Sequence, residues 1–375
     1  MEVIHIITGL NDGGAEASLV RLCIADKKNK HRVISLMGFG KYGPVLRDNN
    51  ITVDTLNMQQ GKFTFRGFYK LYKILKECKP SAVQTWMYHA DLIGGVAARF
   101  VGIKNISWGI HHSNLTPGDC KKSTIYIAKL CGYLSSFIPK NIICCADASA
   151  KVHSNIGYCQ SKLKVIYNGY ELDLFNDKKI KVSHIKSEFN IPDSIILLGM
   201  VGRFHPFKDH ENLIQALGLL KAQSYDFKCL LVGQGITSDN KNLVNWLISN
   251  NVKDDVILAG ARDDIPDIMN AIDIHLLSSS SEAFPNVLNE AMACGTPCVS
   301  TDVGDASLII GSTGWVVSPK DSEELAKGII LALTVKDSDL NDWDLRKKQS
   351  RARVERNFSI ASMVKKYDKI WRDEK

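Results

Sequence analysis

Residues 281–297 read SEAFPNVLNEAMACGTP, and the signals in this stretch fix how it folds. Pro285 favours the start of a helix, and Gly295 marks its end. We therefore predict Glu290 on a short helix and Glu282 on the loop before it. The start of a helix is also an anion site, because unpaired backbone N–H groups and the helix dipole point to the same place. Carboxylates beside such a site indicate a ligand with both hydroxyls and phosphates.

Strand and helix patterns alternate on both sides of this stretch, in two series. The first series has strands near 1–10, 32–37, 82–86, 105–109, 141–146 and 164–167, and helices near 17–25, 67–78 and 91–100. The second has strands near 195–201, 228–232, 256–259, 272–277 and 297–300, and helices near 212–222, 241–250, 265–270 and 322–333. Such alternation indicates parallel sheets covered by helices on both faces. We predict an α/β chain with two doubly wound, Rossmann-like halves.

The length of 375 residues fits two domains of about 150 to 200 residues each. The first series closes at an Asn-Gly turn, and a charged interval without periodicity follows it. We therefore place an N-terminal domain at 1–168 and a C-terminal domain at 169–357, with the linker inside 168–180. A helix within 358–375 has no strand after it, and we expect it to pack back toward the N-terminal domain.

The composition excludes several classes of protein. Apolar residues make up 45% and charged residues 23%, as in globular chains. The net charge of +7 suits a phosphorylated substrate or an anionic membrane, and no nucleic-acid partner is expected because no zinc-finger or RRM motif accompanies it. The ten cysteines are scattered without a Cys-x-x-Cys pair. With no signal peptide and no run of about 18 to 20 apolar residues, we expect reduced thiols in a cytoplasmic protein.

Gly13 and Gly14 follow the first strand pattern and precede a helical one. Glycines at this place let a backbone approach a phosphate closely. The full Gly-x-Gly-x-x-Gly spacing is absent, so a tight turn needed for strand–helix packing explains the pair equally well.

Arg203 and Lys208 stand just past the strand pattern at 195–201. Ligands of open α/β sheets bind at this carboxyl edge. An Arg fork and a Lys point charge suit a diphosphate, because it accepts bidentate and single hydrogen bonds together. The alternative is a solvated loop with surface cations.

Glu282 and Glu290 suit the recognition of hydroxyls, since an ionised carboxylate accepts paired hydrogen bonds from a vicinal diol. A glycosidase pair is another interpretation, but it requires a defined carboxylate separation that a sequence does not give. An acid near a helix start can also merely complement the helix dipole.

Taken in order, the Gly-Gly-x-Glu, Gly-Arg-Phe and Glu-x(7)-Glu motifs resemble the retaining glycosyltransferases of family 4, of the bacterial surface-polysaccharide and O-antigen type. The resemblance runs along nearly the whole chain and is strongest from Gly199 to Gly304. It implies a GT-B fold, in which two Rossmann-like domains face a central cleft. A nucleotide-sugar donor would lie mostly against the second domain, and the first would bind the acceptor.

The resemblance also implies roles for single residues. Arg203 and Lys208 would neutralise the donor diphosphate, and Glu290 would hold the ribose hydroxyls. Glu282 would contact the donor sugar. The further donor-binding positions are Gly13, Gly14, Ala261, Arg262, Phe284, Pro285, Asn286 and Val287, of which Ala261 and Arg262 would hold the base largely through their backbone. The catalytic set is completed by His111, near the reacting sugar, with His112 as the alternative. Asp305 stands where the family often has a second glycine.

For the reaction, the resemblance implies a front-face substitution in which the leaving phosphate takes the acceptor proton. Charge builds on the diphosphate, so cations aimed there stabilise the transition state more than the ground state. No Asp-x-Asp motif lies in a suitable context, and we expect neither a cofactor nor a tightly bound metal.

Our prediction for the acceptor starts from residues 62–73. Their sequence, KFTFRGFYKLYK, mixes cationic and aromatic side chains. This pattern suits anchoring at an anionic leaflet, and it also suits an ordinary amphipathic surface helix. With the resemblance, we expect a peripheral enzyme at the cytoplasmic face of the membrane. It would move a hexose or N-acetylhexosamine from a UDP- or GDP-sugar to a polyprenyl-diphosphate-linked saccharide. The alternatives are a nucleotide-sugar 2-epimerase and a non-catalytic nucleotide-sugar-binding protein.

Overall fold

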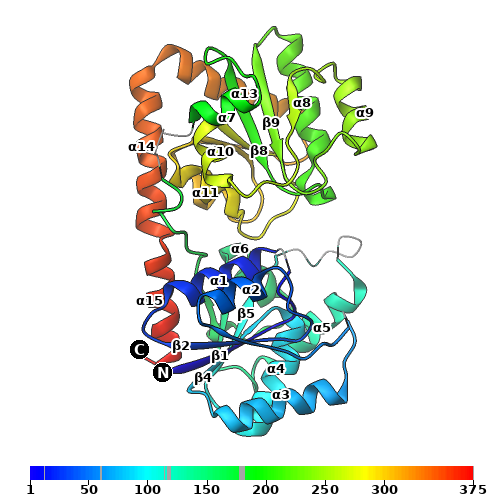
Figure 1. The fold of residues 1–375 in the computed structure, drawn as a ribbon, viewed down its shortest axis with the longest axis vertical. Helices are drawn as coiled ribbons and strands as arrows, with labels where there is room; N and C mark the ends of the chain where they lie inside the picture. Colours follow the sequence, from blue (N-terminus) through cyan, green and yellow to red (C-terminus); the bar gives the residue numbers. More distant parts are fainter. Residues whose placement is uncertain (12, 60, 114, 116–119, 177–181, 375) are drawn as a thin grey trace. The chain divides into compact units, whose positions relative to one another are not determined.

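The computed structural model describes residues 1–374 except 12, 60, 114, 116–119 and 177–181. The chain forms two compact units, each built on its own parallel sheet (Figure 1). Unit 1 consists of Met1–Gly169 together with Ile360–Lys375, and unit 2 consists of Tyr170–Ser359. Both ends of the chain therefore belong to unit 1.

Unit 1 contains a seven-stranded sheet with the order β3-β2-β1-β4-β5-β6-β7, in which every pairing is parallel. Its strands are β1 (Glu2–Ile7), β2 (Lys30–Ser35), β3 (Thr52–Thr55), β4 (Ala82–Trp86), β5 (Ile106–Ile110), β6 (Asn141–Cys144) and β7 (Leu163–Val165). Its helices are α1 (Gly14–Ala25), α2 (Tyr42–Asp48), α3 (Phe65–Cys78), α4 (Tyr88–Val101), α5 (Lys122–Leu134), α6 (Asp147–Asn155) and α15 (Ile360–Trp371).

Helices bury both faces of this sheet. Ile4 and Ile6 of β1 pack into the cluster formed with α3, α4 and α5, whereas Val3 and Ile7 pack into the cluster formed with α1, α2 and α15. The alternation follows from the two-residue period of a strand. Burial on both sides explains why these strands read as continuous apolar runs. Trp371 of α15 is buried in the second cluster.

Unit 2 contains a six-stranded parallel sheet with the order β10-β9-β8-β11-β12-β13. Its strands are β8 (Ile196–Val201), β9 (Phe227–Val232), β10 (Val256–Leu258), β11 (Ile274–Leu277), β12 (Cys298–Thr301) and β13 (Trp315–Val317). Its helices are α7 (Val182–Glu188), α8 (His210–Ala222), α9 (Lys241–Ser249), α10 (Ile265–Ala271), α11 (Asn286–Ala293), α12 (Ala306–Ile310), α13 (Ser322–Ser338) and α14 (Leu340–Asn357).

Two expectations about this architecture are confirmed. The chain is an α/β protein with two doubly wound parallel sheets. Glu290 lies on the short helix α11 and Glu282 on the loop before it. The strand order reverses between β1 and β4 in unit 1 and between β8 and β11 in unit 2. Open α/β sheets bind their ligands at such reversal points, at the carboxyl ends of the strands.

No helix among the described residues has the length and apolarity that crossing a membrane requires.

Candidate functional site

In unit 2, the loops after β8 and β11 meet at the reversal point. The Lys208 ammonium donates a hydrogen bond to Oε1 of Glu282 over 2.5 Å, and the Ser279 hydroxyl donates to the same oxygen over 2.9 Å. The backbone N–H of Ser280 donates to the carbonyl of Phe207 over 2.8 Å. The structure therefore brings together two of the predicted site residues, which lie 74 positions apart in the chain.

Arg203 lies at the start of the loop after β8. Its side chain is exposed and forms no ion pair with another described residue. Its neighbour Phe204 donates its backbone N–H to the carbonyl of Gln234 over 2.7 Å, which ties the loop to the one after β9. The two loops can come this close because residue 233 is a glycine. A Cβ at Gly233 would lie 2.2 Å from the Gly202 carbonyl oxygen. The guanidinium thus stands on a firmly held loop and faces solvent.

The loop that carries Glu282 has a second support, from the loop after β12. The backbone N–H of Asp305 donates to the carbonyl of Ala283 over 3.1 Å. Gly304 has a φ of +55°, and a Cβ there would lie 2.3 Å from the Ala283 oxygen. Asp305, the departure from the family pattern, is buried, and its backbone fixes the position of this loop.

The helix α11 begins directly after this loop. Pro285 is its N-cap and offers no side-chain acceptor to the first turn. The hydroxyl of Tyr170 donates to Oδ1 of Asn286 over 2.5 Å, and Phe284 is buried against the ring of Phe358. Glu290 is half-buried one turn further along. Val287 is also half-buried in the first turn. The first turn of α11 therefore has a fixed position directly after the loop that carries Glu282.

Ala261 and Arg262 follow β10, at the edge of the sheet. The Arg262 guanidinium donates to Glu188 over 2.9 Å and to Oδ1 of Asp264 over 2.8 Å, and these hydrogen bonds raise its pKa above the usual range. Ala261 is exposed. One strand, β9, separates β10 from β8, so this loop is displaced from the Arg203 loop by about 10 Å across the sheet. The structure does not bring these two residues into contact with Lys208 or Glu282.

In unit 1, His111 follows β5. Both of its ring nitrogens are buried without a hydrogen bond to another described residue. Burial lowers the pKa of His111 to about 3, so the imidazole is neutral at neutral pH. His112 is half-buried, and its backbone carbonyl accepts a hydrogen bond from Ser149 over 3.1 Å. Buried polar atoms without partners are uncommon in proteins, and a catalytic role is one explanation for them.

The position of His111 depends on Trp86, which the sequence analysis did not identify. The two rings are stacked, with centroids 5.0 Å apart and an interplanar angle of 24°. Trp86 donates its indole N–H to Nδ1 of His5 over 3.2 Å. Because an indole only donates, Nδ1 of His5 accepts and Nε2 carries the proton. The sequence signal was weak, since Trp86 looks like any apolar residue at a strand end.

The hydrogen-bond chain continues away from His111. Nε2 of His5 lies 2.9 Å from Nδ1 of His31, and Nε2 of His31 lies 3.1 Å from a carboxylate oxygen of Asp26. Burial alone would raise the pKa of Asp26, but hydrogen bonds from His31 and Asn29 hold it well below its usual range. An ionised carboxylate therefore ends the chain and orients both imidazoles.

His5, Cys23 and His31 also form a group whose potential metal-ligand atoms lie within 4.8 Å of one another. The imidazole nitrogens are already used in hydrogen bonds, and burial raises the pKa of the Cys23 thiol well above its usual range. A metal ligand must be deprotonated and free of such bonds. This group therefore fits a hydrogen-bonded core better than a metal centre.

Gly13 and Gly14 lie at the reversal point of unit 1. Gly13 is the N-cap of α1, and a Cβ there would lie 2.3 Å from a carboxylate oxygen of Glu16. Gly14 is the exposed first residue of the helix. Across the reversal point, after β4, Met87 adopts φ 72° and ψ 155°, a conformation that is costly for a residue with a side chain. Strained backbone of this kind clusters at functional sites.

Two family models match the chain, one over each half. Glycosyltransferase Family 4 matches residues 12–174, and Glycosyl transferases group 1 matches residues 196–334. The chain belongs to the family 4 glycosyltransferases with the GT-B fold.

The chain is similar to several bacterial proteins, among them named glycosyltransferases. One is the UDP-Gal:alpha-D-GlcNAc-diphosphoundecaprenol alpha-1,3-galactosyltransferase of Escherichia coli, 24% identical over 81% of this chain and 78% of that protein. Another is the capsular polysaccharide biosynthesis glycosyltransferase CapM of Staphylococcus aureus, 24% identical over 78% of this chain and 77% of that protein. The fold matches that of HepE from Anabaena in complex with UDP-glucose, with a TM-score of 0.86, 21% identity and all of both chains covered.

Proposed function

We propose that this protein is a retaining glycosyltransferase that moves a hexose or N-acetylhexosamine from a UDP- or GDP-sugar to a polyprenyl-diphosphate-linked saccharide. The observation that supports it most is the meeting of Lys208 and Glu282 at the reversal point of unit 2, with Arg203 on the same loop. The name of one relative supports the choice of substrates, because the galactosyltransferase of Escherichia coli is named for UDP-Gal and a diphosphoundecaprenol-linked sugar.

The Lys208–Glu282 pair suits an exchange of partners when the donor binds. A diphosphate carries more negative charge than one carboxylate, and it offers several acceptor oxygens to Lys208 and Arg203. Once Lys208 turns to the diphosphate, the Glu282 carboxylate is released to accept hydrogen bonds from sugar hydroxyls. Glu290 would hold the ribose, close to the first turn of α11.

We propose that Ala261 and Arg262 bind the base through their backbone. The ion pairs that Arg262 forms with Glu188 and Asp264 support this assignment, because they occupy its guanidinium.

During transfer, the sugar carbon loses its bond to the diphosphate oxygen and gains one to the acceptor oxygen. In the front-face reaction the leaving phosphate takes the acceptor proton. Arg203 and Lys208 would stabilise the negative charge that develops there, with no cofactor and no tightly bound metal. His111 would lie near the reacting sugar as a neutral imidazole.

We also propose that unit 1 contacts the cytoplasmic face of the membrane. On α3, Phe65 is 84% exposed and Tyr69 67% exposed, and both lie among exposed cations such as Lys70 and Lys73. On α5, Tyr133 is 72% exposed. Helices α3 and α5 cover the same face of the sheet, and aromatic and cationic side chains on one surface suit an anionic interface.

The test begins with a thermal-shift screen of UDP- and GDP-sugars, because a ligand that binds the folded state raises its melting temperature. The stabilising donor is then incubated with a polyprenyl-diphosphate-linked saccharide, and the anomeric configuration of the product is determined by NMR. We expect transfer with retention. Isomerisation of the donor alone would instead identify an epimerase, and binding without turnover on any acceptor would identify a non-catalytic binder.

A further inference from the structure

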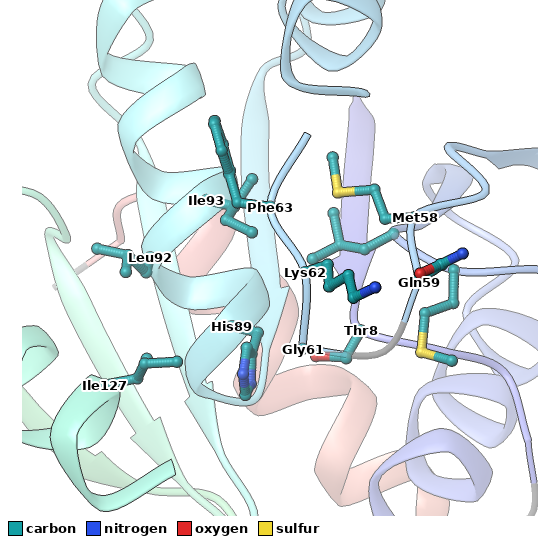
Figure 2. A pocket seen from close by; sticks show the side chains of 12 residues that line it. Thr8, Met58, Gln59, Gly61, Lys62, Phe63, His89, Leu92, Ile93 and Ile127 are labelled. Atoms are coloured by element: carbon teal, nitrogen blue, oxygen red, sulfur yellow. The ribbon is translucent and has the colours of Figure 1, made fainter. Parts of the chain in front are cut away.

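An apolar cavity of about 230 Å³ opens within unit 1, beside the start of α4 (Figure 2). Thr8 after β1 and Met37 after β2 contribute to it, as do His89 at the start of α4 and Ile127 of α5. It therefore lies at the carboxyl edge of the sheet, the same edge that carries His111. Because β4 and β5 are neighbours, the strand ends that lead to His89 and His111 are about 5 Å apart across the sheet.

The walls of the cavity select an apolar ligand. Figure 2 shows Leu92 and Ile127 on one side and Met58 on the other. Burial lowers the pKa of His89, which favours a neutral ring. Lys62 supplies the cation of the lining. A saccharide would lose hydrogen bonds against such walls, whereas a hydrocarbon with an anionic end matches them.

The size of the cavity sets the length of hydrocarbon that it holds. An apolar cavity of about 150 Å³ stays dry in proteins and accepts a benzene ring. A cavity of about 230 Å³ is larger than that and has room for roughly one or two branched five-carbon units. A longer chain must therefore continue outside.

Aromatic residues just before α3 and at its start form an apolar path along which a hydrocarbon chain can leave the cavity. Phe63 lines the cavity and is 51% exposed. Its ring packs edge-on against Phe65, with centroids 5.3 Å apart, and it also contacts Phe68 at 5.8 Å. Phe65 is 84% exposed. The apolar wall of the cavity is thus continuous with the exposed aromatic surface of α3.

We propose that this cavity binds the first isoprene units of the polyprenyl acceptor, with the Lys62 ammonium against its diphosphate. The inference rests on the proposed function, because that function supplies a ligand with an apolar chain, a diphosphate and a saccharide in this order. The chain continues over Phe63 and Phe65 to the membrane. The saccharide, on the other side of the diphosphate, extends along the sheet edge toward His111.

The first experiment measures binding and needs no turnover. A photoreactive farnesyl diphosphate is cross-linked to the full chain, and the labelled residues are identified by mass spectrometry. We expect labels on Met58, Leu92 and Ile93, which unlabelled farnesyl diphosphate prevents. Labels confined to the exposed rings of α5, such as Tyr133, would overturn the proposal.

The second experiment fills the cavity. Leu92→Trp should abolish the label and raise the KM for a polyprenyl-linked acceptor at least tenfold, with the KM for the donor and the turnover of a lipid-free acceptor unchanged. Leu130→Trp on α5 is the matched control, because Leu130 is 36% exposed and does not line the cavity. An equal KM in both variants would contradict the proposal.

Three further measurements distinguish an unfolded variant, a role of Leu92 in membrane docking and a failure of the proposed function. Donor binding by thermal shift reports whether Leu92→Trp leaves the protein folded, and Leu92→Phe replaces it if the Trp variant does not fold. Leu92→Trp should sediment with anionic vesicles as the native chain does, and loss of sedimentation would show that Leu92 acts in membrane docking instead. If no sugar is transferred to any acceptor while farnesyl diphosphate still labels the cavity, the proposed function fails and the prenyl site stands.

Discussion

The two units share one architecture but place different chemistry at their reversal points. In unit 2, the loops after β8 and β11 carry charges, and Lys208 is paired with Glu282. In unit 1, the same edge carries a neutral His111 and an apolar cavity. Parallel sheets with similar strand order therefore do not determine the ligand. The side chains on the loops do, and here they suit an anionic donor in one unit and a partly apolar acceptor in the other.

The two units also differ in the interactions that hold their site residues in position. The loops of unit 2 are fixed by backbone hydrogen bonds, such as the one from Asp305 to Ala283. In unit 1, His111 is fixed by ring stacking on Trp86, which is itself held by a buried chain of hydrogen bonds. Charged side chains on unit 2 can exchange partners without a change in the backbone. The imidazole of unit 1 cannot turn without losing its stacking partner.

The strongest test of this comparison removes the cations of unit 2. We expect Arg203→Ala and Lys208→Ala each to lower kcat/KM by about 10²- to 10³-fold, the loss seen when one group that stabilises developing charge is removed. Lys241→Ala, at the exposed start of α9, is the control and should leave the rate unchanged. Steady-state kinetics with a circular dichroism spectrum of each variant measures the effect. Native turnover in a folded Arg203/Lys208 double variant would contradict the role of these cations.

The sequence predicted the features that depend on local signals. Pro285 and Gly295 bracket α11 closely, because helix starts and ends are encoded by neighbouring residues. The strands β3 and β13 were not predicted, since each has only four or three residues at a sheet edge and shows no long apolar run. Short edge strands depend on their neighbours for hydrogen bonds, which a local pattern does not record.

The contacts of the candidate site could not be predicted in the same way. Lys208 and Glu282 were predicted one by one from their motifs, but their contact follows from the adjacency of β8 and β11. His111 was likewise predicted from its place after a strand, but its stacking on Trp86, which was not predicted, follows from the adjacency of β4 and β5. Strand order is a property of the whole sheet. Motifs could thus nominate single candidate residues, whereas the contacts between these residues required the fold.

The second test concerns the support of His111 in unit 1. Trp86→Phe keeps an aromatic ring that can stack on His111. It removes the indole N–H that donates a hydrogen bond to Nδ1 of His5. A buried acceptor without a partner costs about 1 to 3 kcal/mol, so we expect the free energy of unfolding to fall by that amount. The KM for the donor should not change, because the donor residues lie mainly on unit 2.

Urea denaturation measures this loss, and Trp343→Phe in unit 2 is the matched control. Trp343 is buried and stacks on Trp315, so its replacement removes a similar volume without an imidazole partner. If both variants lose equal stability, the hydrogen bond to His5 contributes nothing beyond packing.

The third test concerns a property that both units share, and its effect on stability is absent at neutral pH. Burial lowers the pKa of His111 in unit 1 to about 3, and burial together with the charge of Lys208 lowers that of His275 in unit 2 to about 3. An unfolded histidine has a pKa of about 6.5 and binds protons first as the pH falls. Each histidine therefore leaves stability intact above about pH 6.5 and reduces it progressively as the pH falls toward 3. The slope is at most about 1.4 kcal/mol per pH unit for each residue.

His111→Asn and His275→Asn should each flatten the pH dependence of the urea midpoint between pH 6.5 and pH 4. His184→Asn, at an exposed position on α7, is the control variant. Only His111→Asn should also lower turnover with the acceptor, because His275 lies within β11 and has no place in the proposed reaction. Equal activity in the two variants would remove His111 from the catalytic set and leave it, like His275, with a structural role alone.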